Sequence, residues 1–301
     1  MGKFLLADTM APFEFVVPAT LNEAIALLDP DDPGIRPVGG ATAVMLMMKA
    51  GVLQLTRMVS LRNLEPEHSS VSVDAAGYLH IGGMASLSSL EHSAVVKKGW
   101  PLLTRTLRTL SNVRVRNVAT LGGNLAHGDP HMDMPPVLSA LGATAVLSGP
   151  SGKRQVKVED LCTGYYETVV ARNELVTEVI VPPQGALRAA YMKVTTRAAH
   201  DWPALGVAVV LDMDGDRIKS SSLIVGAATD RATRLVGAEA MLQGQTLSDT
   251  LLREAGDNAA QQIDIVGDPH GSASYKKQLL RVYLGRAIRK ATDTGPVKEH
   301  A

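Results

Sequence analysis

Apolar residues along the chain recur at two spacings, one typical of helices and one typical of strands. The stretch 20–30, "TLNEAIALLDP", has a helical apolar face behind a threonine and a glutamate at capping-box spacing, and its final proline ends the helix. Residues 71–74 and 78–81 alternate in the manner of half-buried strands about an "AAG" turn. The spacing of Ser88 and Glu91 predicts a second capping box at the start of another helix.

The second half of the chain shows strand patterns followed by helix patterns. "ATAVLSGPSGKRQVKV" predicts a hairpin about its "GPSG" turn, and the composition then changes near residues 181–185, the best candidate for a domain boundary. Three strand-like stretches follow, the last two joined by "DGD", and two helical stretches come after them. The terminal helix is expected to bury one apolar side, made of Leu279, Val282, Tyr283 and Ile288.

Composition narrows the class of protein. The 301 residues are 46% hydrophobic and carry 30 basic and 30 acidic side chains, which suits about two globular domains and gives no net charge to attract nucleic acid. The single cysteine, Cys162, excludes a disulfide or an all-cysteine cluster within this chain. "MGKFLLADTMAPFEF" lacks a secretory apolar region and "AVMLMM" is too short to span a bilayer, so we expect a cytoplasmic protein without membrane insertion.

Candidate chemistry gathers in Thr120–Pro136, "TLGGNLAHGDPHMDMPP". His127 and His131 are four residues apart, with Asp129 and Asp133 beside them, so a metal site is one interpretation. A regular helix would place both histidines on one face, but Pro130 excludes that helix, and no "HExxH" is present. The roles of His131 and Cys162 stay open.

The glycine pairs support another interpretation. We expect Gly122 and Gly123 to turn the backbone through positive φ, so that successive amides can converge on a diphosphate. A second pair, Gly39 and Gly40, follows a strand-like approach and precedes a helix, where unsatisfied amides favour anions. Neither pair fits "GxGxxG", and no P-loop is present. Glycine turns that bind nothing are common, so a plain turn also stays open.

The two glycine segments together carry a resemblance. "VGGATAVMLMMK" and "VRNVATLGGNLAHGDPHMDMPPVLSALGA" resemble the FAD-binding medium subunit of molybdenum hydroxylases, a family that includes xanthine dehydrogenase and carbon monoxide dehydrogenase. The resemblance continues through "ELVTEVIVP", "AAYMKVTTRAAHDWPALGVAVVL", "RATRLVGAEAMLQG" and "GSASYKKQLLRVYLGRAIRKA". It therefore covers nearly the whole chain, in order.

The resemblance implies an α+β protein with a vanillyl-alcohol-oxidase (PCMH)-type FAD-binding fold. An FAD-binding domain would span residues 1–180, with lobes of about 1–58 and 59–180. A C-terminal domain of the molybdenum hydroxylase flavoprotein type would span 185–293, and 294–301 would form a tail.

The resemblance also implies which residues contact FAD. The first glycine segment would hold the diphosphate through backbone amides and the Thr42 hydroxyl, and the second would close on the flavin and the diphosphate. Asp133 would bind ribose, Leu175 or Val176 would line a ring pocket, and Lys193 would lie near the flavin. The implied cofactor-binding residues are Pro37, Val38, Gly39, Gly40, Ala41, Thr42, Ala43, Val44, Leu110, Ala119, Thr120, Gly122, Gly123, Asn124, His127, Asp133, Leu175, Val176 and Lys193.

Two residues depart from the family pattern. Ala41 stands where many relatives have a hydroxyl, histidine or asparagine, which removes one side-chain hydrogen bond worth about 1 kcal/mol. Leu110 stands where some relatives place an aromatic ring over the flavin, so the ring coverage expected here is aliphatic.

As a function, the resemblance implies the flavin subunit of a heteromeric molybdenum hydroxylase. It would take electrons from a small subunit with two [2Fe-2S] clusters and pass them to NAD, oxygen or a quinone. A large molybdopterin subunit would oxidise the substrate, in an expected dimer of heterotrimers. Two alternatives remain, a free-standing flavin reductase of the same fold and a metal-binding or scaffold protein without redox function.

Overall fold

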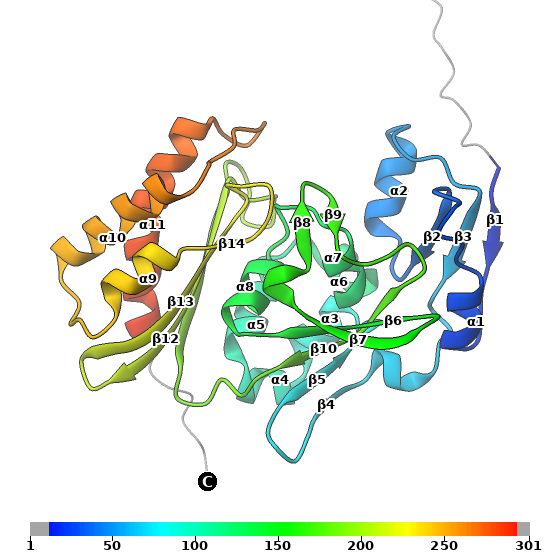
Figure 1. The fold of residues 1–301 in the computed structure, drawn as a ribbon, viewed down its shortest axis with the longest axis horizontal. Helices are drawn as coiled ribbons and strands as arrows, with labels where there is room; N and C mark the ends of the chain where they lie inside the picture. The colour runs from blue at the N-terminus through cyan, green and yellow to red at the C-terminus, as the bar shows by residue number, and fades with distance from the viewer. Residues whose placement is uncertain (1–11, 294–301) are drawn as a thin grey trace, which may run out of the picture.

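The chain builds three successive α+β units, each around its own main sheet (Figure 1). This computed structural model describes residues 12–293, so the expected tail 294–301 lies outside the described residues. The first unit is a small parallel sheet in the order β1-β3-β2. In chain order it contains β1 (Glu14–Val16), α1 (Leu21–Ala26), β2 (Ile35–Val38), α2 (Thr42–Lys49) and β3 (Arg57–Ser60).

Helix α1 begins as its sequence predicts. The Thr20 hydroxyl accepts a hydrogen bond from the Glu23 amide at 3.2 Å, and the Glu23 carboxylate accepts one from the Thr20 amide at 3.3 Å, which completes the capping box. Ala24 and Ile25 are buried on the face that the apolar spacing predicts. The helix ends at Ala26, before the predicted proline stop.

The second unit is an antiparallel sheet in the order β4-β5-β10-β6-β7, with helices α3 to α8 gathered beside it (Figure 1). Its strands are β4 (Val71–Val73), β5 (Leu79–Gly82), β6 (Thr144–Gly149), β7 (Gly152–Lys157) and β10 (Leu175–Val181), and the small hairpin β8 (Cys162–Gly164) and β9 (Glu167–Thr168) lies outside this sheet. Its helices are α3 (Leu87–His92), α4 (Ala94–Gly99), α5 (Pro101–Leu107), α6 (Val113–Val118), α7 (Leu121–Ala126) and α8 (Met134–Ala140), with short 3-10 turns η1 (Pro66–Ser69) and η2 (Val158–Asp160). The predicted hairpins β4–β5 and β6–β7 are both confirmed.

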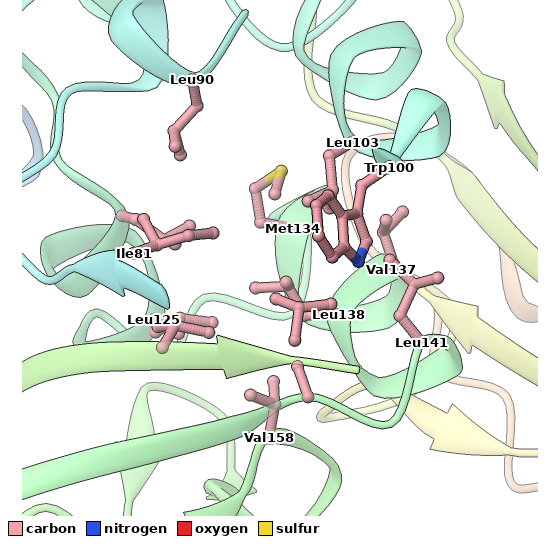
Figure 2. Packing of buried hydrophobic residues seen from close by; sticks show 14 of the residues in the cluster. Ile81, Leu90, Trp100, Leu103, Leu125, Met134, Val137, Leu138, Leu141 and Val158 are labelled. Carbon is pink, nitrogen blue, oxygen red and sulfur yellow. The ribbon is translucent and has the colours of Figure 1, made fainter. Parts of the chain in front are cut away.

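Apolar side chains from this sheet and its helices form one continuous core (Figure 2). Met134 and Leu138 of α8 lie between Ile81 of β5 and Trp100 (Figure 2). The Trp100 indole also donates a hydrogen bond to the Pro182 carbonyl at 2.7 Å, so its single polar atom is satisfied inside the core.

One predicted helix start is wrong. Helix α3 begins at Leu87, because the Ser86 hydroxyl, and not that of Ser88, accepts from a first-turn amide. The carboxylate of Glu91 does not complete a cap and instead accepts a hydrogen bond from Arg116 at 2.8 Å. Only Ser88 has a glutamate three residues later, so the capping-box pattern pointed to it, whereas the observed cap at Ser86 uses the serine hydroxyl alone.

The third unit is an antiparallel sheet in the order β11-β12-β13-β14. One face packs on α5 and α8 of the second unit and the other is covered by the terminal helices, so the middle strand β12 is buried along most of its length (Figure 1). Its elements are β11 (Arg188–Val194), β12 (Leu205–Asp214), β13 (Arg217–Gly226), β14 (Thr233–Arg234), α9 (Val236–Leu242), α10 (Asp249–Gln262) and α11 (Ala273–Asp293). Three helices follow the strands where the sequence predicts two.

The buried face of α11 differs in part from the predicted one. Ile288 is buried as expected, but Val282 is 38% exposed, and Leu279 and Tyr283 are only partly buried. The fully covered side chains lie on a neighbouring line of the helix, made of Lys276, Leu280, Leu284, Ala287, Ile288 and Ala291. This buried face contains a lysine and two alanines, so a search for large apolar residues at helical spacing did not identify it.

Helices α10 and α11 approach each other closely at Gly256, which gives a test of the packing. A Cβ at Gly256 would lie 2.3 Å from the Arg281 carbonyl oxygen, whereas a Cβ at Gly99 meets nothing within 4 Å. We expect Gly256→Ala to destabilise the fold by about 1–3 kcal/mol, because two helix backbones must move apart. Gly99→Ala is the matched control and should be neutral or stabilising by up to about 1 kcal/mol. Chemical denaturation of both variants measures the difference, and equal stability contradicts the packing described for Gly256.

Candidate functional site

The two glycine motifs meet in space. Gly39 and Gly40 follow β2 in the first unit, and they face the segment that enters α7 in the second unit. A Cβ at Gly40 would lie 1.9 Å from the Val118 carbonyl oxygen, and one at Gly39 would lie 2.5 Å from the Thr120 hydroxyl. Any side chain at either position would therefore push the two units apart.

Helix α2 begins at this meeting point with no cap. Its N-cap residue, Ala41, has φ 56° and provides no side-chain hydrogen bond, and the first turn contains no acidic residue. The amides of Thr42, Ala43 and Val44 belong to the first turn, where no intrahelical acceptor exists. The amino end of α2 is therefore an electropositive site able to hold a phosphate.

The second motif has a different geometry from the predicted one. Gly122 and Gly123 lie inside α7 and have no positive φ, so the expected open turn of amides at this pair is wrong. The Gly122 amide donates to the Gly83 carbonyl at 2.8 Å, and the Gly123 amide donates to the Thr120 hydroxyl at 3.2 Å. Glycine at 122 instead allows close packing, because its Cβ would lie 2.7 Å from the Val176 carbonyl oxygen.

Asn124 brings an unpaired polar atom to this region. Its side chain is 9% exposed, and its amide nitrogen lies 3.1 Å from the Met132 sulfur. Its Oδ1 is buried and has no hydrogen-bond partner among the described residues, which marks a place for a donor from outside the chain. The glycine contact, the uncapped α2 and this orphaned oxygen together fit an elongated, phosphate-bearing cofactor.

The apolar residues expected at the site lie at different depths. Leu110 is buried in the core of the second unit, and Leu175 is buried in a cluster of the first. Val176 is partly buried, with its carbonyl against Gly122. Pro37, Val38 and Ala119 hold the backbone on either side of the glycine contact, in β2 and at the end of α6.

His127 ends α7 and faces an aromatic ring that the sequence did not single out. Its imidazole lies 5.1 Å from the Tyr166 ring in an edge-to-face arrangement. Burial lowers the pKa of His127, and Asp129 opposes this only in part, so the ring is neutral at neutral pH. Tyr166 itself has φ 59°, an unusual backbone conformation for tyrosine.

Asp133 and Lys193 form a buried pair between the second and third units. The Lys193 ammonium donates to Asp133 at 2.8 Å and to the Thr109 carbonyl at 3.1 Å, and the Tyr191 hydroxyl donates to Asp133 at 2.6 Å. Burial raises the pKa of Asp133, while Lys193 and Tyr191 favour its charged form. Both oxygens of the Asp133 carboxylate accept hydrogen bonds from the protein, which gives Asp133 a structural role. Its predicted contact with ribose stays a prediction.

The remaining members of the suggested metal set do not converge with Asp133. His131 lies between Asp129 and Asp268, at 2.9 and 2.7 Å. Within residues 12–293, no group of three or more histidine, cysteine, aspartate or glutamate side chains is placed to hold a metal ion. Cys162 is half-buried in β8, and burial raises its pKa, which leaves the thiol protonated.

Several residues that contact this region were not predicted from the sequence. Tyr191, Asp268 and Lys276 lie far along the chain from the glycine motifs, and only the fold brings them to the loop after α7. The one usable signal was Lys276, a charged residue in line with the buried Leu280 and Leu284 of α11. A buried lysine needs a partner, so its position predicts an acid nearby.

None of the helices within residues 12–293 is long and apolar enough to cross a membrane.

Two family models match the chain. The FAD binding domain in molybdopterin dehydrogenase matches residues 11–184, and the CO dehydrogenase flavoprotein C-terminal domain matches residues 190–291.

Curated relatives align over almost their full length. The glyceraldehyde dehydrogenase medium chain of Sulfolobus acidocaldarius is 31% identical over 278 residues, covering 92% of this chain and 98% of that protein. The carbon monoxide dehydrogenase medium chain of Hydrogenophaga pseudoflava is 29% identical, covering 93% and 96%.

Solved structures agree with this assignment. Carbon monoxide dehydrogenase from Hydrogenophaga pseudoflava superposes with a TM-score of 0.91 at 29% identity, covering 95% of this chain and 99% of that one. Quinoline 2-oxidoreductase from Pseudomonas putida 86 gives 0.89 at 28% identity, covering 95% and 98%. These matches confirm the expected α+β fold of the PCMH type and the expected cofactor, FAD. The chain belongs to the family of FAD-binding medium subunits of molybdenum hydroxylases.

Proposed function

We propose that this chain receives electrons from an iron–sulfur subunit and passes them to an external acceptor such as NAD, oxygen or a quinone. Its partners would be a small subunit with two [2Fe-2S] clusters and a large molybdopterin subunit, in a cytoplasmic dimer of heterotrimers. The names of its relatives support this assembly, since they are medium chains of carbon monoxide and glyceraldehyde dehydrogenases. The single cysteine also requires the clusters to lie in another chain.

The contact between the glycine motifs is the observation that carries the proposal. It places the uncapped amino end of α2 beside the Val118–Thr120 backbone, where no side chain of Gly39 or Gly40 intervenes. An anionic diphosphate bound there gains the dipole of α2 and the free amides of its first turn. The Thr42 hydroxyl in the same first turn can donate a further hydrogen bond to the diphosphate. The orphaned Asn124 oxygen is an acceptor, so it suits a donor group elsewhere on the cofactor.

The proposed roles follow the residue types. The backbone of Val38–Val44 holds the diphosphate, and the segment Ala119–Asn124 closes on it from the second unit. FAD supplies the redox chemistry, since it accepts electron pairs and can release electrons singly. The chain itself binds, orients and shields the cofactor. It needs no acid–base pair for electron transfer.

A charge placed in the first turn of α2 separates helix stability from anion binding. Ala43→Glu should stabilise the FAD-free protein by about 0.3–1 kcal/mol, because an acid near a helix amino end complements the dipole. The same charge should weaken FAD binding by about tenfold or more, since it repels the diphosphate. Denaturation and flavin fluorescence titration measure the two effects, and Ala43→Gln is the neutral control of matched size. Unchanged FAD affinity in the glutamate variant would remove α2 from the site.

The buried pair gives a second test. Asp133→Asn leaves the Lys193 ammonium without a counter-charge and should cost about 3–5 kcal/mol of stability. Tyr191→Phe removes one hydrogen bond to the same carboxylate and should cost about 1.5–3 kcal/mol. Urea denaturation gives both values. FAD titration of the folded variants then tests the ribose contact, which predicts a greater loss of affinity in Asp133→Asn than in Tyr191→Phe.

Electron transfer itself is tested on the assembled complex. The chain is purified with its companion subunits, substrate is added without oxygen, and the flavin absorption bands are followed with those of the iron–sulfur centres. We expect the clusters to be reduced first and the flavin bands to bleach after them. A chain that purifies alone and oxidises NADPH without partners would instead be a free-standing flavin reductase. A chain that binds no FAD would contradict the proposal in full.

A further inference from the structure

The loop that leaves the second glycine motif is tied to the third unit by His131. Its Nδ1 lies 2.9 Å from Asp129 on the same loop, and its Nε2 lies 2.7 Å from Asp268 of the third unit. The side chains of His131 and Asp129 are almost fully buried, and that of Asp268 is 15% exposed. Water therefore contributes little to the solvation of these three groups.

The geometry fixes the charge of the ring. A neutral imidazole has one N–H and one bare nitrogen, so it can donate to only one of two facing carboxylates. Here both ring nitrogens face carboxyl groups whose pKa values are lowered, and with both of them ionised the two hydrogen bonds require the doubly protonated imidazolium. Burial lowers the pKa of His131, but the hydrogen bonds and charges of Asp129 and Asp268 outweigh it and hold that pKa above its ordinary value.

A closed ring of hydrogen bonds surrounds this histidine. The Lys276 ammonium, fully buried on α11, donates to Asp268 and to the Ala227 carbonyl, the latter at 2.5 Å. The Ala227 amide in turn donates to the Pro130 carbonyl at 2.9 Å, directly before His131 in the chain. The ring therefore joins the loop to α11 and to the residue that follows β13. Positive and negative charge alternate over His131, Asp268 and Lys276, and the peptide groups of Ala227 and Pro130 close the ring.

We propose that His131 is a positioning residue that acts as a charged clasp between the second glycine motif and the third unit, and thereby sets the affinity for FAD. The inference rests on the proposed function of the glycine motifs. The loop 127–133 follows α7 directly, so loss of the clasp frees the carboxyl end of that helix together with Asn124. His131 need not touch the cofactor, because it acts through the loop.

The direction of the pH dependence follows from the groups that face His131. These are Asp129, with Tyr166 beside it, and Asp268, Lys276 and His270. The folded pKa of His131 is raised, so its contribution is complete below its ordinary pKa of 6.5 and is lost as the pH rises through the folded value. The pKa of Asp268 is held at about 2 and that of Asp129 is also lowered, so their charges persist until strongly acid pH.

The experiment measures the FAD dissociation constant of the full chain across pH. In the wild type we expect it to rise by about tenfold between about pH 6 and pH 9, as the imidazolium loses its proton. In His131→Gln, which cannot be charged, it should be high throughout and independent of pH over that range. His80 provides a matched control, because it also lies between two carboxylates, Asp74 and Glu178, but within the sheet of the second unit. His80→Gln should keep the wild-type profile.

Thermal unfolding provides a reading that does not depend on FAD. The wild-type melting temperature should fall over the same alkaline range, and that dependence should be reduced in His131→Gln and Asp268→Asn. A wild-type profile of FAD affinity in His131→Gln overturns the clasp while leaving the proposed function intact. A wild-type protein that binds no FAD at any pH overturns the proposed function, and the melting profiles alone then decide whether the clasp exists.

Discussion

The close approach of two backbones at Gly40 is the constraint on which the candidate site depends. The first unit is a small parallel sheet, and it meets the second unit where Gly40 faces the Val118 carbonyl. With no Cβ between them, the amino end of α2 comes beside the start of α7. The dipole and free amides of α2 then lie beside the helix that contains Asn124 with its orphaned oxygen, although none of these features alone would identify a site.

In the loop that follows the second glycine motif, buried charges are neutralised by side chains of opposite charge. The loop between α7 and α8 contains three ionisable residues that are nearly buried, and each finds its partner in the third unit or within the loop itself. Asp133 meets Lys193 and Tyr191, while His131 meets Asp268. Buried pairs of this kind contribute little net stability but strongly penalise separation, because each half left alone is an unsolvated charge. They therefore fix how the third unit sits on the second.

Much of the secondary structure could be predicted from the sequence, but the geometry of the candidate site could be predicted only in part. The capping box of α1, the β6–β7 hairpin and the glycine-to-helix step at α2 are local, so their residues predict them directly. The conformation of Gly122 and Gly123 was mispredicted because a glycine pair suits an open turn and close helix packing equally well. Pairing between distant segments, such as His131 with Asp268, has no local signature at all. The family resemblance supplied the cofactor, which spacing alone left open beside a metal site.

Ala41 has a consequence for how the site is prepared before anything binds. It holds a left-handed conformation at φ 56°, which glycine would adopt without strain and which costs an alanine about 1 kcal/mol. Glycine there would also sample many other conformations, in the free protein as well as in the unfolded chain. A third consecutive glycine would leave the backbone of this bend free to adopt many conformations, whereas the methyl group of Ala41 restricts them. The residue thus exchanges some fold stability for preorganisation, and less ordering entropy has to be lost when a ligand arrives.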